Sequence, residues 1–255
     1  MGEKPTYEEL EKRIHELEKA EQKREQTELA LQRRLAFEQL VKEISSEFAR
    51  IGGSSSINSA IDRALSSVGT FTEADRAYIF SFRSADTRAD NTHEWCAEGI
   101  EPQIDNLKGI LIDEQLPWFS NHIRNHEVFH VANVGALPHD ALLERKHFEE
   151  QNIQSLIVVP METKERLLGF LGFDAVNRRR NWSEEDRTVL QFFAQTLSHV
   201  IERKNVEEAL RESEAFLQTL IDAIPTPVFY KDRNGNYLGF NKAFETFFGK
   251  KRELI

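Results

Sequence analysis

Cys96, the only cysteine in this 255-residue chain, is the residue with the most reactive side chain in NTHEWCAEGIEPQID (91–105). A thiol beside His93 could be a nucleophile, a chromophore anchor, a metal ligand or a redox switch. On a regular strand, Cys96 shares a face with Glu94 and Glu98. Neighbouring carboxylates raise the pKa of a thiol and disfavour the reactive thiolate. We therefore predict that Cys96 serves in packing.

Three histidines follow one another at four-residue spacing in HIRNHEVFH (122–130). His122 and His126 would share one face of a helix that continued through Asn125, which is a recognisable arrangement for a metal. His130 is predicted to lie in a strand, and no nearby cysteine or spaced acid completes a ligand set. We expect partly exposed histidines and no metal site.

Composition excludes several classes of function. The formal net charge of −10 argues against a nucleic-acid surface, which needs clustered Lys and Arg to neutralise phosphates. One cysteine forms no internal disulfide, and the longest apolar runs, SLIVVPM (155–161) and LLGFLGF (167–173), are too short to cross a bilayer. We expect a cytoplasmic protein with neither nucleic acid nor membrane as a partner.

Strand-like alternation fills the middle of the chain. In 77–83, Tyr78, Phe80 and Phe82 share one face, and THEWCAEG (92–99) is the expected hairpin partner. Two apolar runs, 155–161 and 167–176, are typical of strands covered on both faces. Further strands are expected at 109–115 and 128–134, with a short helix from Pro117 between them. Residues 139–152 are helical by composition.

Helical periodicity dominates both sides of these strands. Residues 1–34 hold eight Lys or Arg and nine Glu, with Leu10, Ile14 and Leu17 at the spacing of a narrow coiled-coil seam. Another helix is expected over 57–68.

A long helix should begin after Ser183, which can cap it, and run to Pro225. Its apolar residues keep a seven-residue register that predicts parallel pairing in a homodimer. These residues are Phe193, Val200, Leu210, Leu217, Ile221 and Ile224.

This order of elements resembles a GAF domain over residues 36 to 203. The resemblance rests on EADRAYIF (73–80), HEWCAEGIEPQIDNLKGI (93–110), SLIVVPMETKERLLGFLGFDAV (155–176) and WSEEDRTVLQFFAQTLSHVIERK (182–204). It implies an α+β fold with an antiparallel sheet flanked by helices. GAF domains of this subgroup occur in bacterial multi-domain sensor kinases and cyclic-di-GMP enzymes.

Residues 212–249 resemble the beginning of a PAS domain, and Asn234-Gly235 suits the turn of its first hairpin. A complete PAS domain needs about 100 residues, so we interpret the chain as a fragment of a longer protein. The expected organisation is a charged N-terminal helix (1–35), a GAF domain (36–203), a connecting helix (204–224) and an incomplete PAS domain (225–255).

The resemblance also implies a pocket between the sheet and the excursion that joins its middle strands. The predicted lining residues are Trp95, Trp118, Phe119, His130 and Phe173. Aromatic walls suit an unknown small molecule, although the same side chains could simply close the core. A bilin is not expected, because bilin-binding GAF domains carry Cys-His at the anchor and here Ala97 follows Cys96.

No ATP-binding glycine box and no GGDEF-like or EAL-like signature is visible, so this fragment is not expected to be an enzyme. We expect a sensory input module that signals through helices to a PAS domain and a histidine kinase output. Two alternatives stay open: the input region of a diguanylate cyclase or phosphodiesterase, and a GAF domain that binds no ligand and serves only in dimerisation.

Overall fold

The computed structural model describes residues 6–49, 54–83, 88–164 and 166–249, and the chain divides after Ser198 into two compact units. The first unit contains a five-stranded antiparallel sheet with the order β2-β1-β5-β4-β3. Its strands are β1 (Arg76–Arg83), β2 (Arg88–Cys96), β3 (Phe129–Val131), β4 (Ser155–Glu162) and β5 (Leu167–Ala175). The predicted α+β fold, the predicted hairpin of 77–83 with 92–99, and the two apolar strands predicted at 155–161 and 167–176 are therefore confirmed.

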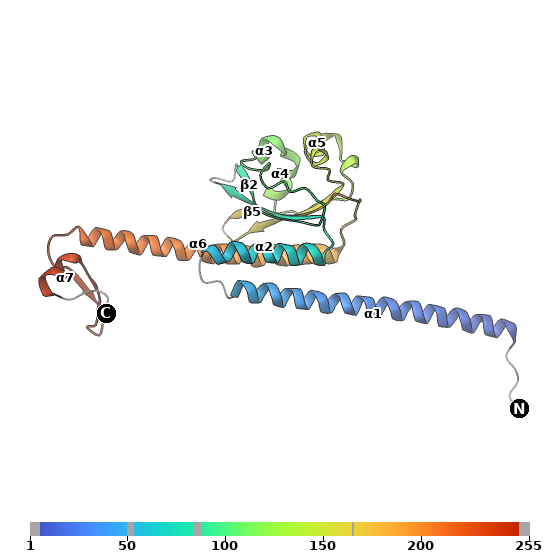
Figure 1. Ribbon diagram of the computed structural model, residues 1–255, viewed down its shortest axis with the longest axis horizontal. Helices are drawn as coiled ribbons and strands as arrows, with labels where there is room; N and C mark the ends of the chain where they lie inside the picture. The colour runs from blue at the N-terminus through green and yellow to red at the C-terminus, as the bar shows by residue number, and fades with distance from the viewer. Residues whose placement is uncertain (1–5, 50–53, 84–87, 165, 250–255) are drawn as a thin grey trace, which may run out of the picture. The chain divides into compact units, whose positions relative to one another are not determined.

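Helices cover both faces of this sheet (Figure 1). On one face lie α2 (Ser54–Phe71), part of α1 (Tyr7–Ala49) and the start of α6 (Glu184–Asp222). On the other face lie α3 (Ile112–Gln115), α4 (Pro117–Arg124) and α5 (Leu142–Glu150), with short 3-10 turns at Val134–Ala136 and His139–Ala141. No described helix is both long and apolar enough to cross a membrane.

Aromatic side chains hold the helices of the first layer together. The Phe37 ring of α1 lies 6.3 Å from the Phe71 ring of α2 and 6.5 Å from the Phe192 ring of α6, and Phe48 stacks on Phe193 at 6.4 Å. This part of α1 therefore belongs to the core, because stacked and edge-on rings add to the free energy of apolar burial.

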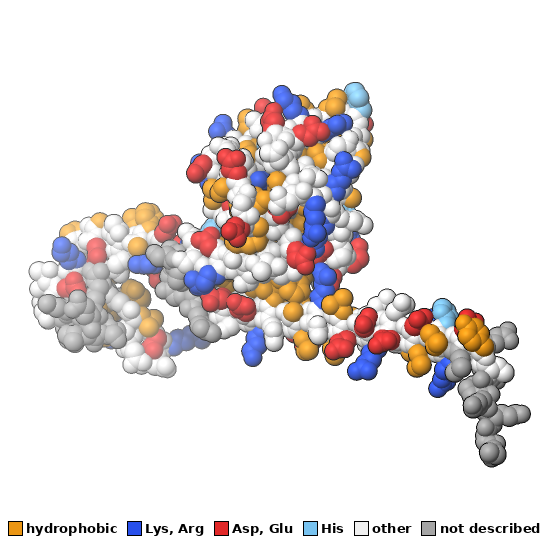
Figure 2. All heavy atoms as spheres, turned by 45° about the vertical axis from the view of Figure 1, so that its right-hand side comes forward, with side chains coloured by type: hydrophobic (Ala, Val, Ile, Leu, Met, Phe, Trp, Pro, Cys, Tyr) orange, Lys and Arg blue, Asp and Glu red, His pale blue; other side chains and the backbone are white. Residues whose placement is uncertain are grey.

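The N-terminal part of α1 is exposed instead. Ile14 and Leu17 of the predicted seam are 56% and 59% exposed, and the side chain of Leu10 lies outside the described residues. Figure 2 shows acidic, basic and apolar side chains interspersed along this helix. Coiled-coil pairing of α1 stays a prediction.

The prediction of a strand at 109–115 is wrong. Only Ile110 pairs with a strand, through an isolated bridge to Ala89, and the chain then turns into α3. Buried Ile112 and Leu116 are four residues apart, so the apolar pattern has the spacing of a helical turn. The strand predicted at 128–134 shortens to β3, and the helix predicted from Pro117 is confirmed, with proline in its first turn.

The second unit holds the end of α6, the hairpin β6 (Phe229–Lys231) and β7 (Tyr237–Phe240), and α7 (Lys242–Phe248). Gly235 in the predicted turn has φ +88°, and the Asp232 carboxylate accepts hydrogen bonds from the backbone N–H groups of Asn234 and Asn236. Large apolar side chains such as Leu238 and Phe247 are exposed.

Candidate ligand-binding site

A cavity of about 40 Å³ lies between the sheet and the elements α3, α4 and α5. Its walls are largely apolar and aromatic: Phe80 stacks on Phe170 with ring centroids 4.7 Å apart, and Phe119 meets Phe170 edge-on at 5.0 Å. Several polar side chains also line it, namely Arg76, Tyr78, Glu94, His147, Gln151 and Asp174. Apolar walls with a few convergent polar groups are typical of small-molecule sites.

Strand register sorts the β1 and β5 side chains along the cavity. On β1, Arg76 and Phe80 are four residues apart on the same face, and on β5 they are paired with Asp174 and Phe170. The charged residues therefore occupy one end of the cavity and the phenylalanines lie further along the strands. We call Arg76, Tyr78, Glu94 and Asp174 the Asp174 cluster.

The Asp174 carboxylate has two hydrogen-bond donors in this cluster. Arg76 Nη1 donates to Oδ2 at 3.2 Å, and the Tyr78 hydroxyl donates to Oδ1 at 3.0 Å. Tyr78 lies across β5 over Gly172, where an added Cβ would come within 2.6 Å of the phenol. The glycine therefore leaves the space through which Tyr78 reaches Asp174.

The Glu94 carboxylate is fixed by backbone hydrogen bonds, which the Asp174 carboxylate lacks within the described part of the chain. Its Oε2 accepts hydrogen bonds from the backbone N–H groups of Gln103 at 2.7 Å and Ile104 at 2.9 Å. Arg76 Nε lies 3.8 Å from Glu94 Oε1, too far for a hydrogen bond. This buried Nε has no hydrogen-bond partner among the described residues, and an unpaired buried donor is costly.

Burial changes the acid–base properties of the cluster. It is the largest cause that raises the pKa of Asp174 from 3.8 to about 7, against the lowering effects of the Arg76 charge and the Tyr78 hydrogen bond. Burial, followed by the charge of Asp174, raises the pKa of Tyr78 well above its usual value. Burial also lowers the pKa of His147 on the cavity wall. Asp174 can therefore exchange a proton near neutral pH.

Glu144 joins two of the elements that cover the cavity. This fully buried side chain of α5 accepts hydrogen bonds through Oε1 from the backbone N–H groups of Trp118 at 2.7 Å and Phe119 at 3.2 Å. A carboxylate at the start of α4 satisfies donors that have no partner within the helix. Sequence reasoning missed Glu144, although it shares the helical spacing of buried Ala141 and Phe148.

Of the five predicted lining residues, only Phe119 lines the cavity. Trp118 covers its outer side, where the indole lies 5.2 Å from the Phe129 ring, but it does not reach the cavity. Trp95 lies on the opposite face of the sheet, because it pairs with Ala77 whereas Glu94 pairs with Tyr78.

Trp95 packs on α2, where a Cβ on Gly69 would come within 2.3 Å of its ring. Phe173 is also on the helix side and packs 5.9 Å from Trp182. His130 is exposed. Its pKa is lowered by partial burial and then by the charge of Arg187 on α6. The structure therefore does not bring Trp95, His130 and Phe173 to the cavity.

Neither Cys96 nor the histidine pair His122 and His126 has the surroundings of a reactive or metal-binding site. Burial, followed by the charge of Glu94, raises the pKa of half-buried Cys96 to about 11, which agrees with a packing role. α4 ends at Arg124, and His126 has φ +60°, so the helix does not continue as a metal arrangement with His122 requires. No group of three or more His, Cys, Asp or Glu in the described residues is arranged for a metal ion.

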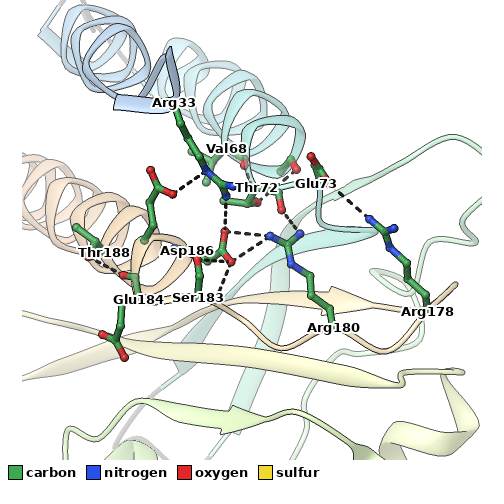
Figure 3. Close-up of polar contacts among 12 residues, drawn as sticks. Arg33, Val68, Thr72, Glu73, Arg178, Arg180, Ser183, Glu184, Asp186 and Thr188 are labelled. Atoms are coloured by element: carbon green, nitrogen blue, oxygen red, sulfur yellow. Dashed lines mark hydrogen bonds and ion pairs between the residues drawn. The ribbon is translucent and has the colours of Figure 1, made fainter. Parts of the chain in front are cut away.

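Another buried carboxylate, Asp186, lies on the helix side of the sheet (Figure 3). Both of its oxygens accept hydrogen bonds from Arg180 Nη2 at 3.0 Å, and Oδ2 also accepts from the Ser183 backbone and hydroxyl at 2.9 Å. Ser183 Oγ in turn accepts from the Asp186 backbone N–H, so the predicted cap is confirmed. We call Asp186 and its partners the Asp186 cluster.

The Asp186 cluster connects three helices. Arg180 also donates to the Thr72 carbonyl at the end of α2 and lies 4.5 Å above the Trp182 ring. Arg33 of α1 lies 3.6 Å from Asp186 and 2.6 Å from Glu185 of α6. These contacts fix the first turn of α6 against α1 and α2 (Figure 3).

Known proteins share this fold. A phycocyanobilin-bound GAF domain from a cyanobacterial phytochrome superposes with a TM-score of 0.57 at 17% identity, over 67% of this chain and 96% of that one. The photoproduct state of GAF3 from a Synechocystis sp. PCC6803 protein gives 0.51 at 24% identity, over 60% and 98%.

One curated relative is similar in sequence. The methanogenesis regulatory histidine kinase FilI of Methanothrix harundinacea (strain 6Ac) is 31% identical over 175 residues, which cover 66% of this chain. The chain spans 19% of the length of that kinase. The GAF domain family matches residues 56–201, and the PAS fold matches residues 215–254. With its sheet, its covered cavity and this match over more than half its length, the chain belongs to the GAF domain family and carries PAS sequence after the GAF domain.

Proposed function

We propose that this GAF–PAS sensory module detects a small molecule in the cavity beside the Asp174 cluster. The observation that carries the proposal is an apolar cavity that ends in buried charges, one of which is an unpartnered arginine donor. Burying charges is costly unless they are paired, so their presence at a cavity favours a binding role over a packing role.

The signal would leave through α6. Its first turn is fixed in the Asp186 cluster, and its residues such as Phe193 belong to the core of the first unit. A ligand that favours one packing of the cover and sheet would shift the packing of α6 by its differential affinity. The similarity to a histidine kinase favours a kinase output, and a cyclic-di-GMP enzyme is the alternative.

We propose that the working form is a homodimer paired along α6. Val206, Leu210 and Leu217 are 64%, 59% and 57% exposed, as expected for a helix that lacks its partner. Light scattering tests this: Leu210→Glu with Leu217→Glu should convert a dimer to a folded monomer. A wild-type chain that stays monomeric at high micromolar concentration contradicts the pairing.

The proteins of similar fold include bilin-bound GAF domains, but a covalent bilin does not suit this chain. The cavity of about 40 Å³ is small beside the roughly 300–1,000 Å³ of drug-sized ligand sites, and the high pKa of Cys96 disfavours its thiolate. The same small volume favours the second candidate function, a GAF domain that binds no ligand and serves only in dimerisation.

Filling the cavity separates the two functions. In the full-length protein, Val158→Phe adds an aromatic ring to a cavity wall, whereas Leu142→Phe makes a similar change at a side chain that is 50% exposed. A sensor should lose its regulated change in output activity with Val158→Phe and keep it with Leu142→Phe. If Val158→Phe folds and is regulated normally, the cavity is not the sensor and dimerisation becomes the better function.

A further inference from the structure

Within the ranges that the structure describes, the polar end of the cavity has one donor and several acceptor positions that are not used by the protein's own hydrogen bonds. Arg76 Nε is a buried donor without a hydrogen-bond partner among the described residues. From the described part of the chain, Asp174 receives one guanidinium N–H and one phenol O–H, although two carboxylate oxygens can accept about four hydrogen bonds. A ligand here can therefore accept from Arg76 and donate to Asp174 at the same time.

Charge limits the ligand further. One positive charge, on Arg76, faces two carboxylates, Glu94 and Asp174, so the ionised cluster has a net charge of −1. An anion would add a third negative charge in a site with little water to screen it. A purely donating cation would balance the charge but would turn its donors towards the unpartnered Arg76 Nε. An uncharged head that both accepts and donates fits both constraints.

Resting on the proposed function, we propose that this cavity selects a small uncharged molecule whose polar head accepts a hydrogen bond from Arg76 and donates one to Asp174. Primary amides and alcohols have this chemistry. The volume of about 40 Å³ has room for about three water-sized groups, since one water needs roughly 10–15 Å³. The body of the ligand is therefore a short apolar group directed towards Phe80 and Phe170.

Three planar molecules of almost identical shape test the charge rule: acetamide, acetate and acetamidinium. Isoleucine methyl NMR spectra of the chain at pH 7.5 report binding, with cavity residues Ile112 and Ile153 as probes. Ile44 and Ile61, buried on the helix side, are the matched controls. We expect acetamide to shift the cavity probes at least tenfold more strongly per millimolar than either ion, with the control probes unmoved.

Asp174→Asn should change this selectivity, because it removes the negative charge and keeps the shape. Acetate should then bind at least tenfold better relative to acetamide. Lowering the pH of the wild type to about 5.5 should act in the same direction, since the pKa of Asp174 is raised to about 7 and acetate stays mostly ionised. The other groups facing Asp174 are Arg76, Tyr78, Glu94 and half-buried Cys96, with His147 on the cavity wall.

The outcomes separate the ligand class from the proposed function. Equal binding of all three molecules, or tighter binding of an ion at pH 7.5, would show that the ligand is not restricted to uncharged molecules. The proposed function would stand, because the cavity would still bind ligands. If none of the three shifts the probes, the class is also overturned, and the cavity-filling variant Val158→Phe then decides whether the cavity senses anything. Tyr78→Phe removes the phenol donor that lowers the pKa of Asp174, so Asp174 should be more protonated at pH 7.5. It provides a second variant should Asp174→Asn fail to fold, and it should shift the selectivity towards acetate in the same direction.

Discussion

Two buried Arg–Asp pairs lie on opposite faces of the same sheet, and their surroundings differ. Asp186 receives hydrogen bonds from Arg180 on both oxygens and from two donors of Ser183, with Arg33 as a further cation. Asp174 receives one hydrogen bond from Arg76 and one from Tyr78.

The difference decides what each carboxylate can do. A buried charge is stabilised only when its lone pairs are satisfied, and Asp186 meets that condition as the hub that joins α6 to its neighbours. Asp174 does not, so burial raises its pKa to about 7 and it borders a cavity next to an unpartnered donor. A buried carboxylate whose hydrogen-bonding positions are all used indicates a structural role. One with unused positions beside a cavity indicates a binding site.

Asp186→Ala should have the largest effect on stability. The substitution leaves the 16%-exposed Arg180 side chain without its carboxylate, and breaking such a pair costs about 3–5 kcal/mol. Tryptophan fluorescence during guanidinium unfolding measures the loss, because Trp95, Trp118 and Trp182 all lie in the first unit. Glu184→Ala, at an 86%-exposed side chain in the same turn, is the control and should change little.

Asp174→Asn should change how stability depends on pH. Because the folded-state pKa of Asp174 is raised from 3.8 to about 7, the folded state binds this proton more tightly than the unfolded chain. Its stabilising contribution is full below about pH 4 and is lost as the pH rises to about 7, on the order of 2–4 kcal/mol.

Unfolding curves of both proteins from pH 4 to pH 8 isolate this contribution. The free energy of unfolding of the wild type should fall relative to that of Asp174→Asn across this range. A constant difference would mean that Asp174 is as well satisfied as Asp186, and the contrast between the two clusters would be lost.

Glu144→Ala should cost less, about 1–3 kcal/mol, because it removes an acceptor for two backbone N–H groups at the start of α4. Hydrogen exchange should show faster exchange at Trp118 and Phe119 while the Asp186 cluster stays protected. Glu149→Ala on the same helix removes only a half-exposed partner of Arg145 and serves as the control. Equal protection in both variants would mean that Glu144 does not hold the cover.

Most of the fold could be predicted from the sequence, but the site could not. Alternation at Tyr78, Phe80 and Phe82, the apolar β4–β5 pair and the Ser183 cap are local signals, and each is confirmed. Pairing register is not local, and a shift of one residue exchanges the two faces of a strand. Trp95 and Phe173 were therefore predicted on the wrong side of the sheet, although aromatic walls were expected.

The charged end was visible in the sequence as an exception to the apolar pattern. Arg76 begins the strand RAYIFSFR, and Asp174 interrupts LLGFLGFDA, two runs that are otherwise largely apolar or neutral. Charged residues inside buried strands are rare unless paired, so the two together predict an ion pair across β1 and β5. The cavity beside them depends on side-chain packing, which no local pattern specifies.

The smallest effect is expected at Arg33, which belongs to the same cluster as Arg180 but is 44% exposed. Ion pairs at this exposure contribute about 0–1 kcal/mol and weaken with salt, because water and counter-ions screen them. Arg33→Ala should therefore lower the free energy of unfolding by less than about 1 kcal/mol at low salt and by almost nothing in 1 M NaCl. Arg34→Ala is the matched control, since Arg34 pairs with Glu38 one turn along the same helix, at 3.4 Å. A salt-independent loss of several kcal/mol with Arg33→Ala would mean that Asp186 depends on α1 for its stability, and that the cluster holds its carboxylate less completely than its contacts with Arg180 and Ser183 indicate.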